Sequence, residues 1–246
     1  MASPPVDLDA IRSKQRNQYV CNVCGFNMIG YYPEYCPFCG AHQRNFITSE
    51  ECSARYKLQA TVVNDKVTSL QSTPALGLEH AAYRIETNGT AYWIDCPSCF
   101  DEKLLPVESV MFTHHHFLGA SNLYRDLFAA RVKIHELDSR HKISKTFTFD
   151  DLFTGNFSTD GIEVFHVGGH TPGFTFYIFQ DVLFVCDYVF LKGDRASLNP
   201  FGPPVETKEG FKKIMAVIKD RNISTVCGYR YVTDFVSWKQ RTDLIP

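Results

Sequence analysis

Four cysteines near the start of the chain have the spacing of a single metal site. They form two pairs, Cys21-x-x-Cys24 and Cys36-x-x-Cys39. A Cys-x-x-Cys turn can direct backbone N–H groups at its sulfurs, and a glycine follows each pair directly (Gly25 and Gly40), which permits the backbone conformation that such a turn needs. Thiols at this spacing can bind one tetrahedral ion through four sulfur ligands. The sequence therefore predicts a four-cysteine metal centre.

The surroundings of these cysteines resemble the short rubredoxin-like modules of rubrerythrins. The resemblance covers about residues 15–50 and is carried by Tyr19–Phe26, Pro33–Ala41 and Phe46. Those modules hold one redox-active iron, so the resemblance implies iron here, with zinc, as in zinc ribbons, as the alternative. Several aromatic side chains are expected to exclude water from the ion: Tyr19, Phe26, Tyr31, Phe38 and Phe46.

Length and composition limit the classes of protein to consider. The chain has 246 residues, 44% of them hydrophobic, which is enough for one mid-sized domain and a small one. The net charge of −2 gives no reason to expect a nucleic acid as partner. We find no stretch long enough to span a membrane and no signal peptide. Cys-x-x-Cys pairs without a signal favour a reducing compartment, so we expect a cytoplasmic protein, although a processed protein of an organellar stroma or matrix would look the same.

The pattern along the chain indicates three parts: a polar lead at residues 1–14, the four-cysteine module at 15–50 and a larger domain at 55–246, with Thr48–Glu51 as a linker. In the larger domain, strands are expected at 56–63, 66–70, 80–86, 90–95, 108–113, 132–135, 162–165, 174–179, 182–185 and 225–227. Apolar residues at helical spacing begin at Leu123 and at Phe211. Hairpins interspersed with helices indicate an α/β fold in which helices cover the sheets.

Histidines and an aspartate in the larger domain indicate a second metal site. His114 and His116 follow an apolar strand, and in an extended segment they would share one face while His115 points away. His170 lies in the turn Gly169–Gly173, between two strands. Asp187 ends a further apolar strand, where a carboxylate needs a partner.

The order of these residues resembles the metallo-β-lactamase superfamily over about residues 55–240. The family pattern is an early Asp, His-x-His-x-Asp-His, Gly-His-Thr-Pro-Gly, Gly-Asp and a late Gly-His. Asp95, His114, His116, His170 and Asp187 match it in that order. The resemblance implies an αββα sandwich with a metal site at one edge of the two sheets, and it implies His114, His116, His170 and Asp187 as metal ligands.

The chain departs from that pattern where binuclear members bind their second metal. Leu118-Gly119 stands in place of the Asp-His, and Cys227-Gly228-Tyr229 in place of the late histidine. Three histidines and one aspartate still suffice for one ion, either iron or zinc. Persulfide dioxygenases of this superfamily bind one iron through the residues equivalent to His114, His170 and Asp187. A histidine-carboxylate site with open positions is typical of non-haem iron enzymes.

Some residues are candidates for catalytic or accessory roles. By analogy Asp187, Tyr188 and Tyr229 are the catalytic candidates, and both tyrosines could instead be core residues. Four cysteines of the larger domain remain open between buried packing, a redox-active pair and metal ligation: Cys96, Cys99, Cys186 and Cys227. Cys52 is interpreted as structural.

Three functions are compatible with these features. The favoured one is an oxidoreductase in which the four-cysteine iron exchanges electrons with a mononuclear metal site, acting on a small-molecule substrate of unknown identity and with a redox partner protein. The second is a zinc-dependent hydrolase of thioesters or lactones that uses a zinc ribbon for docking. The third is a non-catalytic metal-binding or scaffold protein. A homo-oligomer fits any of them.

Overall fold

The computed structural model describes residues 6–245, which form two compact units. The first unit comprises the chain up to Ile134 together with Ser139–Leu152. The second comprises His135–Asp138 and the chain from Phe153 onward. The four-cysteine module is part of the first unit, while the domain boundaries at 15–50 and 55–246 stay a prediction.

The N-terminal region begins with a helix where a polar lead was expected. α1 (Leu8–Arg16) is capped by Asp7, whose carboxylate accepts a hydrogen bond from the Ala10 N–H (3.0 Å), and it buries Ile11. Residues 1–5 of the expected lead lie outside the described residues. After α1, three short strands form a sheet in the order β2-β1-β3: β1 (Gln18–Cys21), β2 (Asn27–Ile29) and β3 (Phe46–Thr48).

The expectation of a linker at Thr48–Glu51 is wrong, because a helix starts there. In α2 (Ser49–Arg55) the Thr48 hydroxyl accepts from the Glu51 N–H, and the Glu51 carboxylate accepts from the Thr48 N–H. This reciprocal capping satisfies two backbone donors of the first turn. The Thr-x-x-Glu spacing was visible in the sequence and could have identified the helix.

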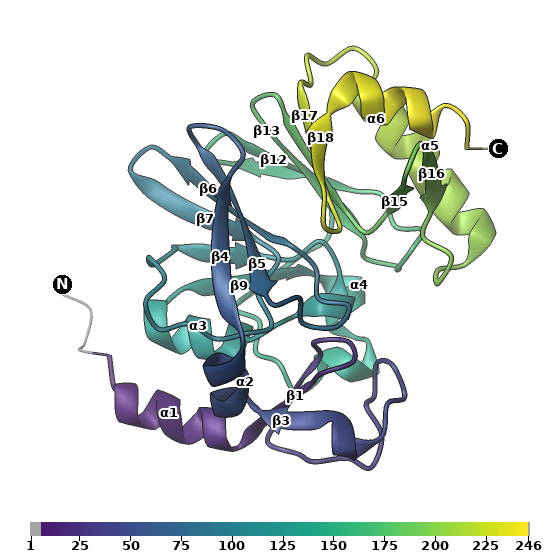
Figure 1. Ribbon diagram of the computed structural model, residues 1–246. Coiled ribbons are helices and arrows are strands. Elements are labelled where there is room, and N and C mark those ends of the chain that lie inside the picture. The colour runs from purple at the N-terminus through teal and green to yellow at the C-terminus, as the bar shows by residue number, and fades with distance from the viewer. Residues whose placement is uncertain (1–5, 246) are drawn as a thin grey trace. The chain divides into compact units, whose positions relative to one another are not determined.

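A seven-stranded sheet with order β10-β9-β8-β7-β6-β5-β4 follows the module (Figure 1). Its strands are β4 (Lys57–Val62), β5 (Val67–Thr73), β6 (Ala82–Thr87), β7 (Thr90–Ile94), β8 (Ser109–Met111), β9 (Arg131–His135) and β10 (Asp151–Phe153). Asn88 and Gly89 both have positive φ between β6 and β7, as the predicted tight hairpin requires. β7, β8 and β9 pair in parallel, and α3 (Ser121–Phe128) makes the crossover from β8 to β9.

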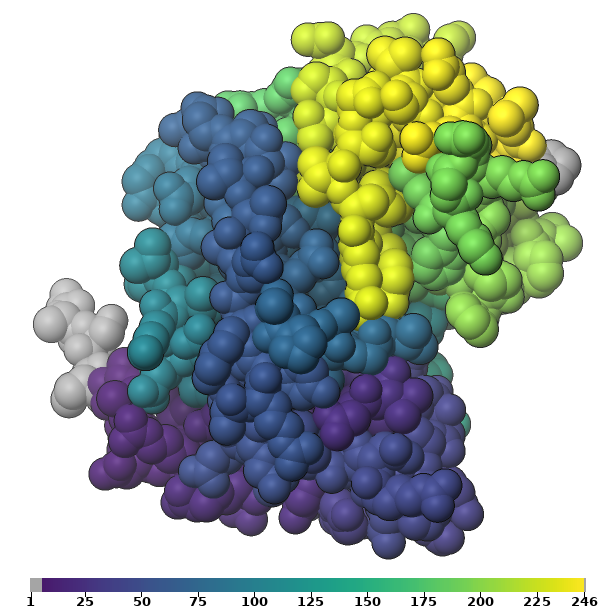
Figure 2. All heavy atoms as spheres, in the orientation of Figure 1, coloured from purple at the N-terminus to yellow at the C-terminus, as the bar shows by residue number. Residues whose placement is uncertain are grey.

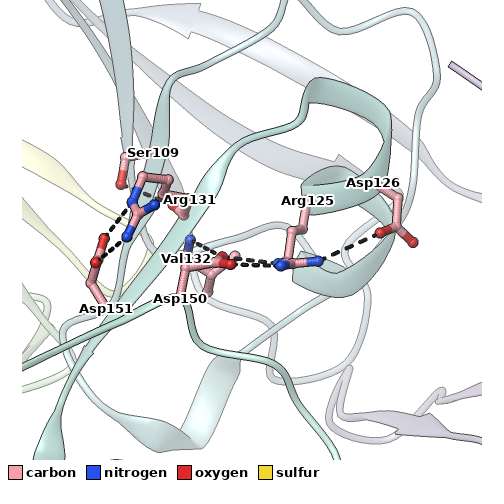
Figure 3. Close-up of polar contacts among 7 residues, drawn as sticks. All are labelled: Ser109, Arg125, Asp126, Arg131, Val132, Asp150 and Asp151. Atoms are coloured by element: carbon pink, nitrogen blue, oxygen red, sulfur yellow. Dashed lines mark hydrogen bonds and ion pairs between the residues drawn. The ribbon is translucent and has the colours of Figure 1, made fainter. Parts of the chain in front are cut away.

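Ion pairs fasten the end of the first unit to this sheet (Figure 3). Arg125 of α3 makes a two-pronged contact with the Asp150 carboxylate, with N–O distances of 2.6 and 2.9 Å. Arg131 of β9 makes the equivalent contact with Asp151. Asp150 also accepts from the Val132 N–H (2.9 Å), so it holds α3 and β9 at once, and its pKa is lowered mainly by the hydrogen bond from Arg125.

The core of the first unit includes the four-cysteine module. Buried Phe26 and Met28 of the module belong to one apolar cluster with Trp93, Val110 and Leu123 of the larger sheet and its helix. A buried amide adds a polar link, because Asn27 Nδ2 donates to the Ser98 carbonyl (3.2 Å). In Figure 2 the purple atoms of the module adjoin the blue atoms above them. The module therefore shares one core with the rest of the first unit.

The second unit contains a six-stranded sheet with order β11-β12-β13-β14-β17-β18. Its elements are β11 (Phe157–Thr159), β12 (Ile162–His166), β13 (Thr175–Phe179), β14 (Val182–Cys186), β17 (Thr225–Gly228) and β18 (Val232–Asp234), with the hairpin β15 (Val189–Lys192) and β16 (Arg195–Leu198) and the helices α4 (Glu136–Ser139), α5 (Pro204–Ile218) and α6 (Phe235–Thr242). Every residue of β13 and β14 is buried, as their continuous apolar sequences indicate. β14 pairs in parallel with β17 after the crossover through α5.

None of the helices within residues 6–245 is both long and apolar enough to cross a membrane.

Candidate metal centres

The four cysteines of the N-terminal module lie together at metal-binding distance. The Sγ atoms of Cys21 and Cys39 are 3.8 Å apart, those of Cys24 and Cys36 are 3.7 Å apart, and all four lie within 4.8 Å of one another. Four sulfurs about 2.3 Å from a central ion in tetrahedral arrangement are separated by about 3.8 Å, for zinc and for iron alike. The geometry therefore fits one tetrahedral ion and does not choose between the two metals.

The backbone of each turn has the conformation that the sequence predicts. The N–H groups of Val23 and Cys24 point at the Cys21 sulfur, and those of Phe38 and Cys39 point at the Cys36 sulfur. The glycines that follow have positive φ, +82° for Gly25 and +73° for Gly40. A residue with a side chain would be strained in this conformation. The glycines therefore allow each turn to adopt the backbone conformation in which its N–H groups face the sulfur.

Contacts among the thiols show why this cluster needs a cation. Hydrogen bonds from Cys24 and Cys36 lower the pKa of Cys21, whereas hydrogen bonding to Cys21 raises the pKa of Cys24 and of Cys36. One thiolate is thus favoured at the expense of its neighbours, since adjacent like charges repel one another. Four ionised sulfurs at these distances require a metal ion between them.

The five aromatic residues predicted around this centre pack in the same apolar cluster as its cysteines: Tyr19, Phe26, Tyr31, Phe38 and Phe46. Phe26 stacks on Phe38 with 6.2 Å between ring centroids and meets Phe147 edge-on. Cys21, Cys24 and Cys36 are buried, while Cys39 reaches the surface. Water is therefore excluded from the centre except on the side of Cys39.

Phe38 connects this centre to residues 114–117 of the same unit, called the histidine segment below. It stands between Cys36 and Cys39 in the chain, and its ring lies 5.3 Å from that of His116 and 5.2 Å from that of Phe117, measured between centroids. One side chain thus spans from a cysteine turn to a predicted metal ligand.

The histidine segment is not extended as the sequence analysis expected. His115–Phe117 form a 3-10 helix that begins directly after His114, because the chain turns at the end of β8. The helical turn still brings the rings of His114 and His116 to within 4.7 Å of each other. His115 is buried and stacks on His141 at 4.1 Å.

His114 is oriented by a buried hydrogen-bonded chain. The Asp95 carboxylate accepts from the Thr113 hydroxyl (2.9 Å) and from the Thr113 N–H (2.9 Å), and the same hydroxyl lies 2.9 Å from His114 Nδ1. Because the Thr113 proton is directed at Asp95, its oxygen accepts from Nδ1–H, and the lone pair of His114 is then on Nε2. A lone pair on Nε2 is what a metal ion requires.

His80 lies beside this histidine segment, although the sequence analysis did not single it out. Its ring is buried, 5.6 Å from His114 and 3.4 Å from Phe117 between centroids. His80 belongs to no motif, so only the folded chain could bring it here.

In the second unit, a buried carboxylate positions the loop that carries His170. Asp138, which is 0% exposed, accepts from the Thr171 hydroxyl and from the Gly173 N–H, both at 2.7 Å. A side chain at position 173 would collide with Asp138, since an added Cβ would lie 2.8 Å from its Cγ. Asp138 is 32 residues before His170, and no motif marks it.

We expect Asp138→Ala to weaken metal binding at His170 by about 10- to 100-fold, the cost typical of removing a residue that orients a ligand. The Thr171 hydroxyl and the Gly173 N–H would lose their acceptor, and the loop would no longer be held. Asp138→Asn is the matched control, because its amide oxygen can still accept from Gly173 and its size is unchanged. Zinc titration of both variants checks this, and equal affinities would contradict the role of Asp138.

His170 and Asp187 form a buried pair in the second unit. His170 Nε2 lies 3.5 Å from Asp187 Oδ2, and both side chains are about 95% or more buried. Two ligand atoms about 2.0–2.1 Å from a tetrahedral ion are separated by about 3.4 Å, so this pair fits half of a metal site. The structure describes His114 and His116 within one unit and His170 and Asp187 within the other, and their joint binding of one ion belongs to the proposal below.

Two of the residues that replace second-metal ligands, Leu118 and Gly119, are unsuited to ligation. Leu118 is fully buried in the apolar core. Gly119 has φ +53°, and a Cβ there would lie 2.3 Å from the Cys96 carbonyl oxygen and 2.4 Å from that of Pro97. A histidine at 119 would require the backbone at 96–97 to move.

The two catalytic tyrosine candidates have different surroundings. The Tyr188 hydroxyl is within donating distance of two backbone carbonyls, that of Thr207 at 2.9 Å and that of Gly168 at 3.2 Å. Burial raises the pKa of Tyr188. This favours a structural brace under the His170 loop, the core role that the sequence left open. Tyr229 is half-buried, packed edge-on against Phe190 with Arg230 over its ring.

The cysteines of the larger domain are buried: Cys96, Cys99, Cys186 and Cys227. Cys96 and Cys99 belong to two different apolar clusters. Cys99 donates to the Tyr56 carbonyl (3.4 Å) and shares an apolar cluster with Cys52, and the hydrogen bond with Cys99 raises the pKa of Cys52. Burial raises the pKa of Cys96 and of Cys227. For Cys96 and Cys227, burial and a raised pKa fit the packing role better than a redox-active one.

Comparison with solved structures identifies the architecture. The metallo-β-lactamase from Hirschia baltica matches 77% of this chain and 98% of its own, with a TM-score of 0.62 and 13% identity. That from Pontibacter korlensis matches 76% and 98%, with a TM-score of 0.60 and 17% identity. The DIM-1 metallo-β-lactamase matches 76% of this chain and 96% of its own, with a TM-score of 0.61 and 16% identity. The chain has the metallo-β-lactamase fold.

The metallo-β-lactamase fold and the α/β class predicted from the sequence are therefore confirmed, together with the N-terminal four-cysteine cluster. No model of a protein family matches the sequence, and no curated relative matches it either. At these identities the likeness extends to the fold alone, so the metal and the reaction have to be argued from the residues of this chain.

Proposed function

We propose that this protein is a metal-dependent oxidoreductase in which the four-cysteine centre exchanges electrons with a second centre held by His114, His116, His170 and Asp187. The contact of Phe38 with His116 carries the proposal. Bound iron at both centres would supply one-electron redox chemistry.

The residues of this chain contribute three things to that function. The cysteine turns present a preformed thiolate site whose aromatic surroundings exclude water. Phe38 provides a packed path from the turn Cys36–Cys39 to the imidazole of His116, and covalent fusion keeps donor and acceptor at a high effective concentration. Cys39 at the surface leaves one side of the centre accessible to a redox partner protein.

The second centre is proposed to hold one ion. Thr113 fixes the tautomer of His114, and Asp138 fixes the loop of His170. Leu118 and Gly119 cannot supply the additional ligands from which binuclear sites are built. Three imidazoles and one carboxylate leave room for a small substrate on the ion, as in mononuclear non-haem iron sites.

Elemental analysis with a visible spectrum of freshly purified protein tests the proposal. We expect two metal ions per chain, iron among them, and thiolate-to-iron absorption that bleaches on reduction. A colourless protein that contains only zinc would overturn it.

We expect Phe38→Leu to slow electron exchange between the two centres severalfold while leaving the metal content unchanged. Leucine is apolar but shorter, and it removes the ring that contacts His116. Phe147→Leu is the control, since Phe147 packs on Phe26 within the same aromatic cluster. Rapid-mixing measurement of reoxidation after reduction of the four-cysteine centre checks this, and identical rates in native protein and Phe38→Leu would contradict the path.

A zinc-dependent hydrolase is the second candidate, supported by the names of the solved structures, which are metallo-β-lactamases. In that case the second centre would activate water for attack on a thioester, lactone or related ester. Turnover would then need no electron donor and would be unaffected by Phe38→Leu. Screening such esters with zinc-loaded and iron-loaded protein separates the candidates.

A further inference from the structure

Asn199 lies directly on the two ligand atoms of the second unit. Its side-chain nitrogen is 2.8 Å from Asp187 Oδ2 and 3.2 Å from His170 Nε2, and the residue is 4% exposed. Neither a motif nor the resemblance to the superfamily pointed to this residue. The inference below rests on the proposed function, since it takes His170 and Asp187 as metal ligands.

The orientation of the Asn199 amide is determined by its other end. Its Oδ1 accepts from the Phe201 N–H at 2.9 Å. If the amide were flipped, its NH2 group would meet that donor, so the amide nitrogen must face Asp187 and His170. Asn199 is therefore a hydrogen-bond donor at this site and cannot be a metal ligand in this conformation.

The two N–H groups of the amide occupy the positions that a cation would need. One donates to the Asp187 carboxylate, and the other faces His170 Nε2, whose lone pair accepts it in the tautomer that carries its proton on Nδ1. A lone pair that accepts a hydrogen bond cannot also bind a metal ion. We propose that Asn199 acts as a placeholder. It holds the side chains of His170 and Asp187 in their positions in the metal-free protein, and it moves away when the ion binds.

Movement of Asn199 would move the loop at residues 199–203. Gly202 is pressed against His170, because a Cβ there would lie 2.8 Å from His170 Cα and 2.9 Å from its Nδ1. Phe201, at the tip of the loop, is 83% exposed. Occupation of the metal site thus sets the position of an exposed aromatic ring beside it, and the loop reports whether the site is loaded.

Zinc titration of Asn199→Leu tests the placeholder. Leucine keeps the branched shape of asparagine, although it is somewhat larger, and it has no N–H groups. Zinc then no longer competes with N–H donors, and we expect affinity at the second centre to rise on the order of tenfold. The full chain is used with its four-cysteine site already filled, and the second equivalent of zinc is followed by chelator competition. Asn156→Leu is the control, since Asn156 is exposed in the same unit and bonds only to the His166 N–H in the described structure.

Hydrogen exchange of the native protein tests the loop without any substitution. The Phe201 N–H is protected by Asn199 in the structure, so it is expected to exchange severalfold faster after zinc is added. Because this measurement uses only the native protein, it tests the placeholder even if Asn199→Leu does not fold.

The outcomes separate this inference from the proposed function. Tighter zinc binding in Asn199→Leu, or faster Phe201 exchange with zinc, supports the placeholder. Uptake of a second zinc with unchanged or weaker affinity in the variant and unchanged exchange overturns the placeholder alone. Failure of the native protein to take up a second metal overturns the His/Asp centre of the proposed function, and this inference with it.

Discussion

Replacement of Cys39 by serine is expected to empty the four-cysteine centre and to destabilise the first unit by several kcal/mol, on the order of 5. Metal binding supplies most of the folding energy of small thiolate sites, and a hydroxyl is a poor substitute for a thiolate ligand. Because Cys39 is at the surface, the substitution itself leaves no cavity in the core. The loss in free energy of unfolding should therefore measure the contribution of the bound metal.

The position of the module decides how far that damage extends. If residues 15–50 were a separate module, that module alone would unfold, whereas Phe26 and Met28 are part of the core that holds Trp93. We now expect the whole first unit to be affected and the second to remain folded. The two tryptophans separate these outcomes, since Trp93 is in the first unit and Trp238 in the second.

Metal analysis and thermal unfolding of Cys39→Ser, monitored by tryptophan fluorescence in Trp93→Phe and Trp238→Phe backgrounds, make the measurement. Cys227→Ser is the control, because it makes the same chemical change at a buried position of the other unit. A variant that keeps its full metal content and spectrum would show that the four-cysteine assignment is wrong.

His170→Ala is expected to abolish metal binding at the second centre and to leave the four-cysteine centre filled. Removing one of four ligands leaves an underfilled coordination sphere, and no second ion is proposed nearby to compensate. The loop itself should persist, since Asp138 holds Thr171 and Gly173 rather than His170. The effect on metal content should therefore exceed the effect on stability.

Elemental analysis gives the result directly: two ions per chain in the native protein and one in His170→Ala. His166→Ala, four residues earlier in the same unit, controls for loss of an imidazole, and its Nε2 is engaged with the Pro172 carbonyl at 2.9 Å. An unchanged content of two ions in His170→Ala would mean that the histidine-aspartate pattern no longer binds metal.

Local patterns in the sequence were sufficient to predict features that are formed by residues close together in the chain. The four-cysteine centre is encoded in two short turns with their glycines, so spacing predicted both the site and its backbone conformation. The strands of the metallo-β-lactamase fold were predicted from runs of apolar residues, and the Asn88-Gly89 hairpin from its turn residues. The helix at Ser49–Arg55 was missed although its capping residues were visible, which is an error of interpretation.

Contacts between distant segments could be decided only by the tertiary structure. Asp138 reaches the His170 loop across 32 residues, and Asn199 reaches Asp187 across 12, and neither carries a motif because hydrogen-bond geometry needs no fixed spacing. That Gly119 is enclosed by the carbonyls of Cys96 and Pro97 follows from packing alone. The sequence by itself thus indicated the α/β class, because strand and helix patterns are local, and which residue types could bind metal, because that depends on ligand chemistry. The metallo-β-lactamase fold was implied by the resemblance of its motifs to that superfamily. The tertiary structure decided which residues orient the ligands and that Phe38 meets His116, because such contacts exist only once the chain is packed.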